Sequence, residues 1–300
     1  MSFRLIEKKI KSRDPIAKVR GGSKDGWYLY IQDFKYSLKD IPEKEYSHLS
    51  QKEQDEINKA LETGFEPEDE ELTKLFYEFK EMIKTKNCKL VLREKGKFEY
   101  IPSKKVIERV LVCGISGSGK STWCSRYIYN WKKAHGGNGK KARPFYIVSN
   151  LDKDEVLDKY DPTRLDLEDI AYNGIEIEDI EDSIILLDDI DTIENPSVRR
   201  GVRSFCNNLL EISRHYETYL LITSHQIQNY QQTKVQLNEA TNVVLFPKNN
   251  ARAVNNYLRC YEYFTPEQIQ RILNINSRWI MICKHHTPSY ILTEKQAYII

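Results

Sequence analysis

The feature that most constrains the fold of this chain is the segment VLVCGISGSGKSTW, which runs from Val110 to Trp123. It joins an apolar run to a loop of glycines and serines that ends in a single lysine. Residues Gly114 to Ser121 fit the pattern G-x-x-x-x-G-K-[ST], in which glycines let the backbone turn its N–H groups toward phosphate. Such a loop, placed after a strand and before a helix, predicts a site for a nucleoside triphosphate.

The side chains and the backbone of this loop have separate predicted roles. Lys120 is placed to reach the β- and γ-phosphates, and the hydroxyl of Ser121 is placed to ligate Mg²⁺. The whole set expected to contact the nucleotide is Gly114, Ser116, Gly117, Ser118, Gly119, Lys120, Ser121 and Thr122.

A second constellation is the segment SIILLDDID, from Ser183 to Asp191, an apolar run that ends in acids. This is the form of a Walker B strand, in which Asp188 holds Mg²⁺ through water and Asp189 polarises the attacking water. A carboxylate at the second position favours hydrolysis of ATP over kinase chemistry, so ATP and Mg²⁺ are the predicted cofactors. Asp191 is a less favoured alternative for the catalytic acid, because it lies beyond the end of the strand.

A third element, LLEISRHYETYLLITSHQIQNY, spans Leu209 to Tyr230 and contains another buried strand. The strand ends in the polar cluster Thr223–Gln226, where the amide of Gln226 can hydrogen-bond the γ-phosphate or the lytic water. Arg214, just before the strand, can supply positive charge to the nucleotide of a neighbouring subunit.

The chain divides into an α+β region, residues 1–104, and an alternating β and α region, residues 105–300, with the pattern of a doubly wound α/β domain. In the first region, the sequence predicts a strand at 26–34, two helices, and a hairpin that turns at Lys95–Gly96. In the second, the segment PFYIVSN, 144–150, contains a predicted strand at 145–149 and leaves room for a strand inserted between the phosphate-loop strand and the Walker B strand. The other strands expected there are 109–113, 183–188, 219–223, 243–246 and 279–283.

The ordered set GISGSGKS, IILLDD, SRH and ITSHQ, followed by NVVLF, resembles the FtsK–HerA superfamily, and most of all the genome-packaging ATPases of poxviruses and other large DNA viruses. The resemblance covers Val106 to Ile300. It implies a RecA-like P-loop NTPase core with a mainly parallel sheet, ATP hydrolysis, a homo-oligomeric ring and translocation of double-stranded DNA.

The resemblance also implies residue roles, partners and a location. Asp188 and Asp189 form the Walker B pair, although many relatives have Asp-Glu here; Gln226 reads the γ-phosphate, and Arg214 is the arginine finger. A capsid or portal protein is an expected docking partner. The expected location is the host cytoplasm, in the viral factory, or the virion.

Composition leaves the partner open. The net charge of +2 over 300 residues gives no sign of a polyanion partner, so a DNA surface must be a local patch. The basic segments 132–143 and 198–203 are either solvated surface or DNA contacts, and CKHH, 283–286, is interpreted as structural. No apolar run is long enough to predict a membrane span.

Two other classes of function stay open at this stage. One is a P-loop kinase for a nucleotide or a polynucleotide end, with residues 198–203 as its lid and Asp188 or Asp189 as its base. The other is a nucleotide-switched binding protein. A GTPase is disfavoured, since no NKxD-type segment follows the Walker B strand.

Overall fold

The computed structural model describes residues 1–135, 143–227 and 230–300. Within them, a large mixed sheet has the strand order β4-β14-β13-β12-β11-β6-β10-β9-β7-β8. We call the six strands from β11 to β8 the parallel half, because each is parallel to its neighbours within that half. Their bounds are β6 Arg109–Cys113, β7 Phe145–Ser149, β8 Thr163–Arg164, β9 Ile184–Asp188, β10 Tyr219–Ser224 and β11 Asn242–Leu245.

The remaining strands of this sheet form its antiparallel half, in which every strand runs opposite to its neighbours. They are β4 Lys89–Val91, β12 Ile280–Cys283, β13 Tyr290–Thr293 and β14 Gln296–Ile299. A smaller antiparallel sheet, which we call the N-terminal sheet, has the order β1-β3-β2-β5. Its strands are β1 Ser2–Ile6, β2 Ala17–Arg20, β3 Tyr28–Gln32 and β5 Lys97–Tyr100.

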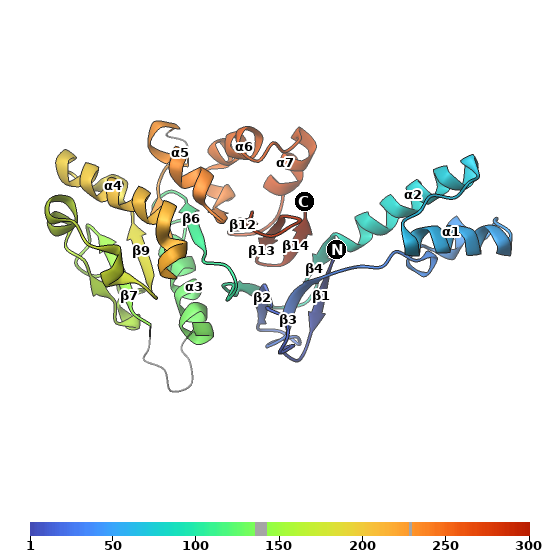
Figure 1. The fold of residues 1–300 in the computed structure, drawn as a ribbon, viewed down its shortest axis with the longest axis horizontal. Coiled ribbons are helices and arrows are strands. Elements are labelled where there is room, and N and C mark those ends of the chain that lie inside the picture. The colour runs from blue at the N-terminus through green and yellow to red at the C-terminus, as the bar shows by residue number, and fades with distance from the viewer. Residues whose placement is uncertain (136–142, 228–229) are drawn as a thin grey trace.

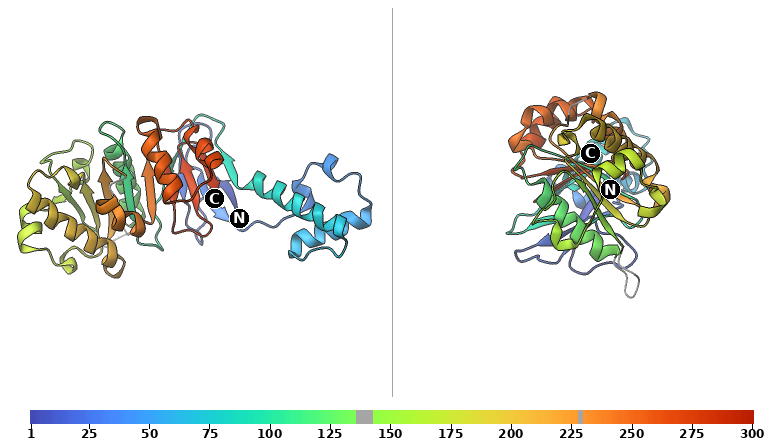
Figure 2. Two further views of the ribbon diagram at one scale, coloured as in Figure 1. Left: turned by 90° about the horizontal axis from the view of Figure 1, so that it is seen from above. Right: turned by 90° about the vertical axis from the view of Figure 1, so that its left-hand side faces the viewer.

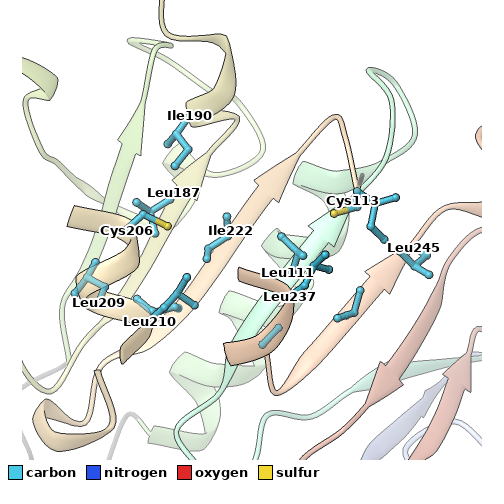
Figure 3. Packing of buried hydrophobic residues seen from close by; sticks show 14 of the residues in the cluster. Leu111, Cys113, Leu187, Ile190, Cys206, Leu209, Leu210, Ile222, Leu237 and Leu245 are labelled. Atoms are coloured by element: carbon cyan, nitrogen blue, oxygen red, sulfur yellow. The ribbon is translucent and has the colours of Figure 1, made fainter. Parts of the chain in front are cut away.

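Two buried clusters lie on opposite faces of the large sheet, because side chains of successive strand residues point to opposite faces. Leu111 and Cys113 of β6 belong to the cluster under helices α4–α7, part of which is drawn in Figure 3. Val110 and Val112 belong to the cluster under α3 and the N-terminal sheet. The helices are α3 Lys120–His135, α4 Pro196–Ile212, α5 Tyr230–Glu239, α6 Ala251–Cys260 and α7 Pro266–Leu273.

Between β3 and β5 the chain forms a helical hairpin of α1, Gln51–Thr63, and α2, Glu70–Asn87, which projects from one end of the molecule (Figures 1 and 2). Ser50 and Glu53 form a capping box at the start of α1, and Gly64 ends the helix in the left-handed conformation. The hairpin has a small buried cluster of its own, with Ile57 and Phe76 in its centre.

Short helical turns complete the described structure. They are the 3₁₀ turns Leu38–Asp40, Glu43–Glu45, Asp158–Tyr160, Ile177–Ile180, Ile190–Thr192 (η6), Ser213–Tyr216 (η7) and Pro247–Asn249, and the π-helical turn Asp169–Asn173.

The fold class is confirmed: a mainly parallel sheet carries helices on both faces and has the P-loop NTPase arrangement, next to an N-terminal α+β region. The predicted strands at 109–113 and 145–149 have the expected bounds. The division at residue 104 stays a prediction, and the cluster beneath α3 contains residues from both sides of it, such as Phe98 and Trp123.

Two predictions about strand neighbours were wrong. The strands on either side of Lys95–Gly96 form no hairpin, because β4 pairs with β14 in the large sheet and β5 pairs with β2 in the N-terminal sheet. A strand does lie between β6 and the Walker B strand β9, but it is β10; the strand at 145–149, β7, lies on the outer side of β9. Strand pairing is a long-range choice that local patterns do not specify.

Candidate nucleotide site

The phosphate loop occupies the turn between β6 and α3, as expected. Gly117 and Gly119 have positive backbone φ angles of 74° and 109°, which residues other than glycine rarely adopt. A Cβ added at Gly114 would lie 2.6 Å from the hydroxyl oxygen of Ser118, so the loop closes tightly over this residue. The Ser118 hydroxyl is buried, and no partner for it is found among the described residues. A tight glycine turn at a helix N-terminus suits an anion.

The order β6-β10-β9 determines what faces this loop. Because the three strands are parallel, their carboxyl ends meet at one edge of the sheet, with Ser224 in register with Cys113 and Ile222 with Leu187. The side chains that follow β10 and β9 therefore lie next to the loop that follows β6. In parallel α/β sheets this is the edge where ligands bind.

Lys120 and Asp189 approach each other at this edge. The ammonium group of Lys120 donates to the carbonyl of Gly114 at 2.9 Å and lies 3.4 Å from Oδ2 of Asp189. The Nε2 atom of His225, just after β10, lies 2.9 Å from the same carboxylate oxygen. Lys120 is only 7% exposed, so its ammonium group is shielded from bulk water, whereas Asp189 and His225 are partly exposed.

Asp188 is the deeper of the two acids. Burial raises the pKa of its carboxyl group, against the opposing effect of a hydrogen bond from Thr223. The Thr223 hydroxyl lies 2.8 Å from Oδ1 of Asp188 and 3.0 Å from Oδ1 of Asp189, and it accepts the backbone N–H of Asp189 at 2.8 Å. Thr223 thus fixes both acids of the predicted Walker B pair.

The residues at this edge fit a magnesium ion. Hydroxyl and carboxylate oxygens are the ligands that Mg²⁺ prefers, and Ser121 at the start of α3 and Asp188 at the end of β9 supply them. The raised pKa of Asp188 agrees with a carboxylate placed where a cation offsets its burial.

Asp191, the alternative catalytic acid, is engaged elsewhere. Its Oδ2 accepts the hydroxyl of Ser224 at 2.8 Å, and its Oδ1 lies 3.0 Å from a guanidinium nitrogen of Arg203 on α4. Asp189 has a left-handed backbone, with φ of 44°, at the turn between β9 and η6. The geometry therefore brings Asp189, and not Asp191, to Lys120.

The other two predicted catalytic residues are both exposed. Gln226 is exposed and lines a cavity together with Asp191, Arg199 and His225. Arg214 is exposed in η7, before the amino end of β10, so it lies at the opposite edge of the sheet from the phosphate loop. The structure does not bring Arg214 to the site of its own chain.

Sequence reasoning did not assign His225, Thr223 and Arg203 to the site. His225 and Thr223 belong to the polar cluster at the end of the third strand, but their contact with Asp189 depends on β10 being the neighbour of β9. Arg203 belongs to the basic segment 198–203, in which Arg199 also donates to the carbonyl of Ile193 at 3.0 Å. These arginines are α4 residues bound within the protein.

The other basic and metal-capable segments have structural contacts. Lys132 donates to the carbonyl of Tyr160 at 2.5 Å, and Arg143 pairs with Asp182 at 2.7 Å, whereas Lys140 and Lys141 lie outside the described residues. In the segment 283–286, the Nδ1 atom of His285 lies 3.2 Å from the amide oxygen of Asn242. Within the described parts of the chain, no three metal-ligating side chains form a cluster, and no helix has the length and hydrophobicity to cross a membrane.

Comparison with known proteins shows a sequence relative in a virophage. No family model matches the chain. The uncharacterized protein V3 of the Sputnik virophage is 36% identical over 223 residues, which cover 74% of this chain and 88% of that protein.

Two of the solved structures that resemble the chain share little sequence with it. One is the genome-packaging NTPase B204 of Sulfolobus turreted icosahedral virus 2, with 14% identity, a TM-score of 0.41, and coverage of 62% of this chain and 96% of that one. The other is the pCW3 conjugation coupling protein TcpA, with 11% identity, a TM-score of 0.41, and coverage of 95% and 77%. On the sequence match, the chain belongs to the same protein family as protein V3 of the Sputnik virophage.

Proposed function

We propose that this protein is an ATP-hydrolysing motor that translocates double-stranded DNA and packages a viral genome into capsids. The observation that carries the proposal is the meeting of Lys120, Asp189 and His225 at the carboxyl edge of three parallel strands. The ordered motifs that resemble the FtsK–HerA superfamily support the motor, and the virophage relative supports a viral setting.

Each residue at this edge has a role in the proposed hydrolysis. The loop backbone from Gly114 to Thr122 and the ammonium group of Lys120 hold the phosphates. Ser121 and Asp188 would hold Mg²⁺, which would supply positive charge to the phosphates when bound. Asp189 accepts a proton from a water molecule while the oxygen of that water attacks the γ-phosphorus. The bond between the γ-phosphorus and the β–γ bridging oxygen breaks, which releases ADP and phosphate.

Two further roles position and complete the reaction. His225 and Thr223 orient the carboxylate of Asp189, because both contact it. Gln226, in the next position along the chain, senses the γ-phosphate. Arg214 acts on the nucleotide of a neighbouring copy, and its exposed position at the opposite edge of the sheet supports a role between subunits of a ring.

The proposed partners are double-stranded DNA, further copies of this chain in a ring, and a capsid or portal protein, and the proposed location is the host cytoplasm. The kinase alternative is not favoured by the structure of its proposed lid. Arg199 and Arg203 of that segment lie on α4 and bind Ile193 and Asp191.

Steady-state release of phosphate from ATP, with and without long double-stranded DNA at two salt concentrations, tests the proposal. Stimulation by DNA that fades with added salt is the expected result, because a motor grips the phosphate backbone electrostatically. Lys120→Ala, which removes the phosphate-binding ammonium group, is the control for contaminating ATPase. Turnover that ignores DNA, or that appears only when a small acceptor is supplied, contradicts the motor.

A further inference from the structure

A cavity of about 270 Å³ opens beside the phosphate loop, on the side away from Asp188. Gly119 and Thr122 of the loop and the first turn of α3 line it, so the cavity is continuous with the predicted phosphate site. Its far wall consists of Phe246, after β11, and Trp279, before β12. Its volume is near the lower end of those of small-ligand pockets, which start at about 300 Å³.

The inner surface of this cavity is aromatic. Trp123 and Trp279 meet edge to face, with ring centroids 6.3 Å apart, and both are more than nine-tenths buried. The ring of Phe246 and the guanidinium of Arg278 flank Gly119, at 3.7 Å and 3.8 Å from the position that a Cβ there would take. Aromatic rings and a guanidinium plane are the groups on which a heterocyclic base stacks.

The outer wall comes from the N-terminal sheet. Arg20 of β2 and Glu99 of β5 pair at 2.7 Å, and Arg126 of α3 lies 3.6 Å from the same carboxylate. Lys97 of β5 pairs with Glu294 at 2.6 Å across to the antiparallel half of the large sheet. The amide of Asn130 on α3 donates to the carbonyl of Tyr100 at 2.8 Å, which ties the sheet to α3. The cavity is therefore closed jointly by residues from both sides of position 104.

The direction of a bound triphosphate follows from this layout. In the hydrolysis proposed above, its γ-phosphate faces Asp189, on the β9 side of the loop. Its nucleoside then leaves the loop on the opposite side, where β11, β12 and the cavity lie. We propose that the cavity lined by Trp123, Trp279 and Arg20 binds the base and ribose of the nucleotide, so that the N-terminal sheet is part of the nucleotide site. This inference rests on the proposed function, since it concerns the same ligand.

Equilibrium binding of two probes tests the pocket without turnover. The non-hydrolysable analogue β,γ-methylene-ATP occupies both the phosphate loop and the pocket, whereas inorganic tripolyphosphate occupies only the loop. In the wild-type protein we expect the analogue to change the fluorescence of Trp123 and Trp279, and tripolyphosphate to leave it unchanged. Trp27 and Trp131, which do not line the cavity, contribute a constant background.

Three variants separate the pocket from the loop. Trp279→Leu is expected to raise the Kd for the analogue about tenfold, because a base–aromatic stack is lost. Arg20→Ala, a change in a half-buried residue that the fold tolerates, is expected to raise it about threefold. Arg271→Ala, on the exposed side of α7 and outside the cavity, is the matched control and leaves it unchanged. The Kd for tripolyphosphate is expected to stay the same in all three.

The outcomes are distinguishable. A higher Kd for the analogue in Trp279→Leu and Arg20→Ala, with an unchanged Kd for tripolyphosphate, supports the pocket. An unchanged Kd for the analogue in both Trp279→Leu and Arg20→Ala overturns the proposal. An equal rise in the Kd values for both probes also overturns it, because the effect then lies in the phosphate loop. If the wild-type protein binds neither probe, the proposed function itself fails.

Discussion

The parallel half and the antiparallel half of the large sheet differ in how their strands are joined and in what lies at their edges. In the parallel half, the connections between strands bring all carboxyl ends to one edge, where Lys120, Asp189 and His225 meet. In the antiparallel half the strands alternate in direction, so no such edge exists, and it presents Trp279 and Arg278 to the cavity instead. In the proposed function, phosphate chemistry and base recognition are therefore divided between two architectures that adjoin where β11 pairs with β12.

The largest effect is expected at the opposite edge of the parallel half. Arg214→Ala should lower ATP turnover by about 10³-fold or more, since arginine fingers contribute 10³–10⁵. Nucleotide affinity of a single, unassembled chain should stay unchanged, because Arg214 is remote from the site of its own chain. Phosphate release by equal mixtures of Arg214→Ala and Asp189→Asn chains checks the role: a mixed ring contains sites with both residues intact and recovers activity, and failure to recover argues against action between subunits.

A buried acid where the N-terminal sheet meets the parallel half makes stability depend on pH. Glu108 accepts hydrogen bonds from Tyr100 and Tyr127, and burial raises its pKa to about 7. Because this pKa exceeds the ordinary 4.5, the folded protein binds the proton more tightly than the unfolded chain. The free energy of unfolding should therefore fall by about 3 kcal/mol as pH rises from about 4.5 to about 7.

Urea denaturation across this pH range measures the effect. In Glu108→Gln that decrease should disappear, whereas Glu68→Gln, an exposed matched change, should keep it. An identical pH profile in wild-type protein and Glu108→Gln would show that Glu108 keeps an ordinary pKa.

Thr223 and Thr218, near opposite ends of β10, allow the carboxyl edge of the sheet to be compared with the amino edge. Thr223→Val removes the hydroxyl that both Asp188 and Asp189 contact, and turnover should fall about tenfold as the acids lose their orientation. Thr218→Val removes an equally buried hydroxyl, bound to the carbonyl of Ile180, just before β10 begins. Both variants should lose about 1 kcal/mol of stability. Equal ATP turnover in the two variants would show that the Thr223 hydroxyl has no role in orienting the two acids.

The smallest effect is expected in the helical hairpin. Ser50→Ala breaks the capping box of α1 and should destabilise that helix by about 1 kcal/mol. Hydrogen exchange of the α1 amides should quicken, whereas phosphate release stays at the wild-type rate; Ser47→Ala, at a nearby exposed serine, is the control. A fall in turnover with the loosening of α1 would mean that the hairpin is coupled to the nucleotide site.

Sequence alone predicts five of the six strands of the parallel half well, because those five are largely apolar runs and each chemical motif follows one. The two-residue strand β8, Thr163–Arg164, has no such run and was not predicted. The structure has strands at all three places that the motifs indicate: β6 before the phosphate loop, β9 at the predicted Walker B motif, and β10 at the third element. The sequence does not predict which strand lies between β6 and β9, since pairing partners are far apart along the chain. The contact of His225 with Asp189 is a consequence of that order, and so was missed.

The antiparallel half and the N-terminal sheet are less predictable for a related reason. The strands flanking Lys95–Gly96 look locally like a hairpin, yet they diverge into two sheets. The turn itself packs on another turn: a Cβ at Gly96 would lie 2.5 Å from the carbonyl oxygen of Gly21. Such close approach between segments some 75 residues apart is a property of the tertiary structure, and no local pattern encodes it.

The central claim is that the carboxylate of Asp189, at the carboxyl edge of the parallel half, accepts the proton of the attacking water. Comparing ATP turnover in Asp189→Asn and Asp191→Asn tests this claim most directly. Asp189→Asn should lose about 10²–10⁴-fold in turnover and still bind ATP, because proton acceptance is removed while the phosphate loop is intact. Asp191→Asn should stay within about tenfold of wild type, since its carboxylate is engaged by Ser224 and Arg203. Loss of turnover in Asp191→Asn with near-normal turnover in Asp189→Asn would contradict the account.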